Sequence, residues 1–303
     1  MPKKSWIKII FAGLVFCLIL ILFLYLPTPK ELSPQPKAAR GNFDLPLIGQ
    51  NDNFFDREQF LQAARMAEDI TPRADIRAVI VPHHLVGSEI IAALIKMSSG
   101  RPIDTVVVIG PNHNNIGREP MASALANWQT QAGELAAAAQ LSEQFLADHR
   151  LQANQSSLEN EHSIGAIAPF IKHYLPQARI LPIVLSSYAG RAEAEKLSDW
   201  LKNNYDEKIL IIFSFDFSHY LTKEDADLKD EETENLIENL LIDKAYALNN
   251  DYVDSPAGLA TALLLAQKSS YKVSIVRHGN SFDYATKKPS ATTSYFGIIF
   301  TNE

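Results

Sequence analysis

Three segments of this sequence join an apolar, β-branched run to a histidine, and this pattern restricts the possible folds more than any other. Residues 76–82 run into His83 and His84, residues 105–111 into Asn112 and His113, and residues 209–215 into Asp216 and His219. Such runs are typical of strands buried on both faces of a parallel sheet. Apolar residues recur at helical spacing between the runs. We therefore predict a single three-layer α/β domain with a mostly parallel central sheet flanked by helices.

The ends of these strands predict a binding site. In open parallel sheets, ligands bind beyond the carboxyl ends of the strands. The chain has eight histidines, and three of the apolar runs end at one. We therefore expect His83, His113 and His219 to converge as metal ligands. Adjacent side chains on an extended backbone point to opposite sides, so His84 is expected to lie beside the pocket while His83 faces it.

The donor types limit the metal. Imidazole and carboxylate groups suit iron, copper, nickel or zinc better than magnesium or calcium. Cys17, the single cysteine, lies in the apolar N-terminal stretch, which excludes iron–sulfur clusters and multi-cysteine zinc sites. A two-histidine, one-carboxylate iron centre and a histidine-rich zinc site that activates water both remain open.

Further residues near the strand ends are candidates for proton transfer. Two residues separate Asp216 from His219, so the carboxylate either orients the imidazole or takes part in the chemistry itself. His162 follows Glu161 at the start of a predicted helix, where helix capping explains the carboxylate but not the histidine. We predict His162 and His219 as acid–base groups, with Asp216 as their catalytic companion.

The N-terminus has the pattern of a membrane anchor. Residues 9–26 are apolar and uncharged, they follow Lys3, Lys4 and Lys8, and at about 1.5 Å per residue they are just long enough to span a bilayer. No small-residue site for signal-peptide cleavage follows. We expect a cytoplasmic, lysine-bearing N-terminus and transmembrane helix at 1–26, a proline-rich linker at 27–40, and an extracytoplasmic α/β domain at 41–303.

Charge and missing motifs exclude several functions. The formal net charge is −7, and an acidic protein body argues against a nucleic-acid partner. The sequence contains no phosphate-binding glycine loop and no Gly-x-Ser-x-Gly elbow. Nucleotide hydrolysis and serine esterase chemistry are therefore disfavoured.

Short motifs distributed through the body resemble the MEMO family, whose bacterial members are called AmmeMemoRadiSam system protein B. They are Val-Pro-His-His-Leu (81–85), Ile-Gly-Pro-Asn-His (109–113), Asn-Glu-His-Ser (160–163), Phe-Asp-Phe-Ser-His-Tyr (215–220) and Gly-Asn-Ser-Phe-Asp (279–283). The resemblance implies a fold similar to that of class III extradiol dioxygenases, which hold non-haem iron at strand ends. It implies His83, His113 and His219 as metal or pocket residues. Its other pocket candidates are His84, Asn112, Glu161, Ser255, Asn280, Ser281 and Asp283.

Two positions depart from the family pattern. A cysteine that members often carry near the pocket aligns with Ser255, and the pattern Glu-His-Ser-x-Glu places a carboxylate where this chain has Gly165. The expected site is therefore dominated by imidazole, and copper–thiolate chemistry is disfavoured.

Together these features predict a membrane-anchored, MEMO-like, metal-dependent oxidoreductase. Iron is the favoured metal, with zinc or copper as alternatives. A non-catalytic module that binds a small molecule or peptide in the same pocket is one alternative function, and a zinc-type hydrolase is another. The family name also implies a radical-SAM system partner. Such a partner belongs in the reducing cytoplasm, whereas the anchor places the domain outside.

Overall fold

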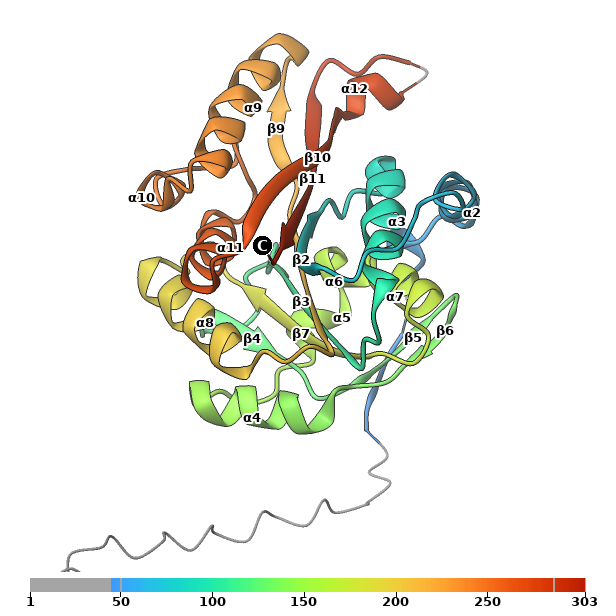
Figure 1. Ribbon diagram of the computed structural model, residues 1–303, viewed down its shortest axis with the longest axis vertical. Coiled ribbons are helices and arrows are strands. Elements are labelled where there is room, and N and C mark those ends of the chain that lie inside the picture. Colours follow the sequence, from blue (N-terminus) through green and yellow to red (C-terminus); the bar gives the residue numbers. More distant parts are fainter. Residues whose placement is uncertain (1–44, 50, 286, 303) are drawn as a thin grey trace, which may run out of the picture. The chain divides into compact units, whose positions relative to one another are not determined.

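The described strands and helices alternate along the chain, as the apolar pattern predicts. A computed structural model describes residues 45–49, 51–285 and 287–302 (Figure 1). The strands are β1 (Leu47–Ile48), β2 (Ile76–Val81), β3 (Thr105–Pro111), β4 (Met121–Ser123), β5 (Asn127–Thr130), β6 (Gly133–Leu135), β7 (Arg179–Leu185), β8 (Ile209–Ser214), β9 (Phe217–Leu221), β10 (Lys272–Asn280) and β11 (Thr292–Thr301).

Helices connect most of these strands. The α-helices are α2 (Arg57–Met66), α3 (Ser88–Met97), α4 (Ala139–His149), α5 (Ser156–Glu159), α6 (His162–Gly165), α7 (Ala168–Tyr174), α8 (Arg191–Asn204), α9 (Lys223–Glu238), α10 (Ile242–Ala245), α11 (Pro256–Ser269) and α12 (Ser281–Tyr284). Short 3₁₀ turns are η1 (Asp52–Phe54), η2 (Leu85–Gly87) and η3 (Ser98–Gly100).

The central sheet is mixed, which corrects the expectation of a mostly parallel one. Its eight strands follow the order β10-β11-β2-β8-β3-β7-β4, with β9 paired to β11 outside this path. The pairs β2–β8, β8–β3 and β3–β7 are parallel. The pairs of β11 with β2, β9 and β10, and of β4 with β7, are antiparallel. The sheet is mixed because β11 joins the parallel strands antiparallel to β2, and β4 pairs antiparallel with β7 at the other end of the path.

Helices cover both faces of this sheet, because alternate strand residues point to opposite sides. One apolar core packs strand residues such as Val79 and Val108 against α2, α3 and α7. The other packs residues such as Ile80 and Ile109 against α8 and α11 (Figure 1). All six residues of β2 and of β8 are buried, so these apolar runs are the two-faced strands that the sequence predicts.

The membrane prediction requires a correction. The expected anchor at 9–26 and the linker at 27–40 lie outside the described residues. Among the residues that are described, no helix is both long enough and apolar enough to cross a bilayer. The absence of such a helix among the described residues corrects the prediction of a membrane-spanning protein. The predicted domain boundaries remain predictions.

Candidate metal centre

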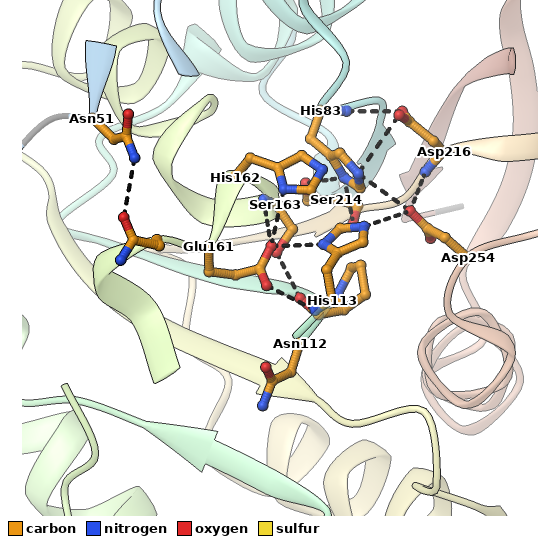
Figure 2. A network of polar contacts seen from close by, with 12 residues as sticks. Asn51, His83, Asn112, His113, Glu161, His162, Ser163, Ser214, Asp216 and Asp254 are labelled. Atoms are coloured by element: carbon orange, nitrogen blue, oxygen red, sulfur yellow. Dashed lines mark hydrogen bonds and ion pairs between the residues drawn. The ribbon is translucent and has the colours of Figure 1, made fainter. Parts of the chain in front are cut away.

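The carboxyl ends of three neighbouring strands meet at one point, because β8 lies between β2 and β3 and is parallel to both. His83 follows β2, His113 follows β3 and Asp216 follows β8. The parallel arrangement therefore brings together residues that are far apart in the chain, as the pattern of strand ends predicts. Figure 2 shows these side chains turned toward a common region.

Three imidazoles form the centre of this region. Ring nitrogens of His83, His113 and His162 lie within 4.8 Å of one another, a group that could hold a metal ion. The ring of His162 stacks on that of His113 with centroids 4.0 Å apart, and it meets His83 edge to face at 4.8 Å. The third imidazole of the group is thus His162, the residue predicted for proton transfer, and not His219.

Helix α6 brings His162 to the strand ends because β3 carries a glycine there. A Cβ added at Gly110 would lie 2.6 Å from Oγ of Ser163, so only glycine permits this close approach. The Ser163 hydroxyl donates a hydrogen bond to the carbonyl of Pro111 (2.8 Å). Glu161 caps the helix by accepting from the backbone N–H of Ser163.

Asp254 is a site residue that the sequence analysis missed. Its Oδ2 lies 3.2 Å from Nε2 of His83 and 3.7 Å from Nε2 of His113, and the side chain is buried. Backbone pairing holds it there, since the Asp254 N–H donates to the carbonyl of Asp216 and Phe217 bridges to Val253. An aspartate shortly before a proline at the start of a helix is an ordinary pattern, so no local feature of the sequence distinguished Asp254.

Hydrogen-bond partners at Nδ1 orient the rings of His83 and His113. His83 Nδ1 lies 3.3 Å from the carbonyl oxygen and 3.2 Å from Oγ of Ser214, and His113 Nδ1 lies 2.7 Å from Oε1 of Glu161. These acceptors favour the proton on Nδ1, which leaves Nε2 of each ring to face Asp254. Metal-binding histidines are oriented by this kind of contact, so the donor set fits a transition metal.

The charges of the centre depend on one another. Burial alone would lower the pKa of His113, but hydrogen bonds with Asp254 and Glu161 raise it to about 10. Burial also opposes charge on His83, yet the nearby Asp216 and Asp254 raise its pKa above the ordinary value. The pKa of Asp254 is lowered, because both imidazoles outweigh the effect of its burial. Burial together with positive charge on His83 and His113 lowers the pKa of His162 to about 3. The carboxylates around the centre therefore favour positive charge on His83 and His113.

Asp216 lies beside His83, with its Oδ2 3.6 Å from Nε2 of that ring. The Oδ1 of Asp216 accepts from the backbone N–H groups of His83 and His84 (3.0 and 3.4 Å), so this carboxylate fixes the loop after β2. His219 lies outside the three-imidazole group. The strand β8 ends at Ser214, and His219 lies in β9, which pairs antiparallel with β11 and has positive φ at Ser218 and Tyr220.

The remaining pocket candidates divide into neighbours of the centre and structural residues. His84 and Ser281 line a cavity of about 540 Å³ that includes none of the three imidazoles of the centre, and Nδ1 of His84 lies 2.6 Å from the Tyr295 hydroxyl. The Asn112 side chain forms hydrogen bonds with the backbone of Ile116. The Asn280 side chain donates hydrogen bonds to the hydroxyls of Thr292 and Ser294. Asp283 is exposed.

Ser255 is buried and precedes α11. Its hydroxyl lies beside the first turn of α11, only 2.7 Å from where a Cβ on Gly258 would be. The neighbouring Asp254 reaches the imidazoles instead.

A smaller cavity opens directly beside the imidazoles. It measures about 230 Å³ and is lined by Phe54, His83, His84 and His162, among others. Phe54 contacts the His162 ring at 5.5 Å, and it lies 3.2 Å from where a Cβ on Gly165 would be. An aromatic ring thus lies against the position where the family pattern has a carboxylate.

Comparison with known proteins identifies the family. A family model described as Memo-like protein matches residues 53–299. The chain belongs to the Memo family. This confirms the resemblance carried by the short motifs, and the match spans the strands, helices and strand-end residues of the centre.

Relatives within the Memo family support the assignment. A MEMO1 family protein of Caldivirga maquilingensis is 29% identical over 222 residues, covering 70% of this chain and 78% of that protein. One from Metallosphaera sedula is 26% identical over 210 residues, covering 67% and 74%. A solved structure titled uncharacterized protein JW3007 from Escherichia coli K12 gives a TM-score of 0.48 at 12% identity. It covers 73% of this chain and 99% of that one, and at this level the likeness carries no argument.

Proposed function

We propose that this Memo protein is a metal-dependent oxidoreductase that binds one divalent transition metal, with iron(II) favoured, at its histidine centre. The observation that carries the proposal is the group of three imidazoles whose ring nitrogens lie within 4.8 Å of one another. Neutral imidazoles with carboxylates nearby suit iron, copper, nickel or zinc. When bound, the metal would supply redox chemistry with dioxygen.

The chain's own residues would prepare this site in two ways. Glu161 and Ser214 orient the rings of His113 and His83 through their Nδ1 atoms, so the Nε2 atoms need not reorganise. The ring of His162 borders the cavity and stays neutral at pH 7, so it can form a hydrogen bond with a small ligand there. The cavity of about 230 Å³ is smaller than the ~300–1,000 Å³ typical of drug-sized ligands, which favours a small substrate.

Metal content tests the binding part of the proposal. Full-length protein is reconstituted without oxygen using iron(II), zinc or copper, and bound metal is measured by mass spectrometry. We expect about one metal per chain, which His83→Ala and His113→Ala abolish. His173→Ala is the matched control, because His173 is exposed and lies outside the centre. A wild-type protein without metal, or equal loss in the control, would contradict the proposal.

An oxygen electrode tests the redox part. Iron-loaded protein should consume dioxygen with a panel of small organic reductants faster than the metal-free protein and His113→Ala do. The cavity of about 230 Å³ beside the imidazoles also supports the second candidate, a non-catalytic binding module. Stoichiometric zinc without oxygen consumption would favour that module or a zinc hydrolase, and hydrolysis of simple esters or amides would separate the two.

A further inference from the structure

The environment of Asp254 is unusual for a structural carboxylate. Only 6% of its side chain is exposed, and one oxygen, Oδ2, faces both His83 and His113. The other oxygen, Oδ1, is buried without a hydrogen-bond partner among the described residues. A buried carboxylate oxygen without a partner is costly, so residues of this kind usually have a further ligand.

The spacing of the donor atoms fits one shared ion. Two ligands about 2.1 Å from the same metal lie roughly 3.0–3.4 Å apart at octahedral or tetrahedral angles. Oδ2 of Asp254 is 3.2 Å from His83 Nε2, within this range, and 3.7 Å from His113 Nε2, slightly beyond it. Since the Nδ1 atoms contact Ser214 and Glu161, the Nε2 atoms are the ones left to bind a metal.

We propose that Asp254 is itself a ligand of the metal and completes a mixed imidazole–carboxylate set with His83 and His113. This inference rests on the proposed metal binding and adds the ligand that selects the metal. The chain carries its carboxylate donor at 254, whereas Ser255, aligned with the family cysteine, faces α11. Oxygen ligands disfavour copper(I), which thiolates select, so the site is expected to prefer divalent iron, cobalt or zinc.

A cysteine placed at the ligand position tests this directly. Full-length Asp254→Cys and Ser255→Cys proteins are stripped of metal and titrated with cobalt(II) under nitrogen. A thiolate bound to cobalt gives an intense charge-transfer band in the near ultraviolet. We expect this band, at one cobalt per chain, in Asp254→Cys and not in Ser255→Cys. Cys17 is common to all the proteins, and the wild type measures its contribution.

The outcomes separate this inference from the metal site itself. Suppose the wild-type protein binds cobalt. If folded Asp254→Cys then gives no band, or if only Ser255→Cys gives the band, Asp254 is not a ligand, although the protein still has a metal site. Wild-type protein that binds no cobalt would overturn both. If circular dichroism shows that Asp254→Cys is unfolded, Asp254→Asn decides, because it keeps the shape of the side chain. We then expect cobalt affinity to fall by at least about 10- to 100-fold, and a change below twofold would refute the inference.

Discussion

Replacing Glu161 with glutamine tests how the metal centre is oriented. In the native protein, Oε1 accepts from Nδ1 of His113 (2.7 Å) and from the backbone N–H of Ser163 (2.9 Å), while Oε2 accepts from the backbone N–H of His113 (2.8 Å). Glutamine offers one acceptor oxygen and one NH₂ group with two N–H donors. At least one of the three donors therefore loses its acceptor and faces another donor.

The size of the effect follows from this arrangement. A buried donor left without a partner costs about 1–3 kcal/mol, and the loss of a charged acceptor for His113 adds about 1 kcal/mol. We expect Glu161→Gln to lower the free energy of unfolding by about 2–4 kcal/mol. Metal affinity should fall about 10- to 100-fold, as it does when orienting partners of metal ligands are removed. The pKa of His113 should fall below about 10, because Glu161 is one of the two carboxylates that raise it.

Three measurements decide the outcome: urea unfolding of the metal-free protein, calorimetric titration with zinc, and the His113 pKa from nuclear magnetic resonance. Glu159→Gln is the matched control, because it makes the same charge change at an exposed position nearby. The control should stay within about 0.5 kcal/mol of wild type. If Glu161→Gln leaves zinc affinity and the His113 pKa unchanged, the orienting role of Glu161 is refuted.

Further predictions concern pH, packing and His219. Metal-free protein should be most stable near pH 6.5 in urea unfolding. In the folded protein the pKa of His162 is about 3, below its ordinary value of 6.5, so the free energy of unfolding falls as pH drops below 6.5. The raised pKa of His113 stabilises the folded protein fully below pH 6.5, and this contribution is lost as pH rises towards about 10. Gly110→Ala should cost at least about 2 kcal/mol and impair metal binding, because its Cβ would meet Ser163. His219→Ala should retain stoichiometric metal by mass spectrometry, because this imidazole lies outside the group of three.

Each of these predictions has its own control. Replacing His162 with asparagine should flatten the acid side of the pH profile, and an unchanged slope would argue against the neutral imidazole. Gly49→Ala is the matched glycine control, because nothing lies within 4 Å of a Cβ at that position. Complete metal loss in a folded His219→Ala protein would show that the centre includes β9.

The local sequence was sufficient to predict the core of the sheet and two of its site histidines. Apolar, β-branched runs specify strands buried on both faces, and parallel neighbours align their carboxyl ends. His83 and His113 could therefore be assigned to one site from their places after β2 and β3. The short motifs were likewise enough to predict the family.

Contacts between distant segments decided what the local pattern could not. The antiparallel pairing of β11 with β2 and of β4 with β7 makes the sheet mixed, and the turn after β8 places His219 outside the group of three imidazoles. The same turn pairs Phe217 with Val253 and so brings Asp254 to the centre. Strand burial is fixed by each segment's own side chains, whereas the position of Asp254 depends on hydrogen bonds with Asp216, 38 positions earlier in the chain, which no local pattern encodes.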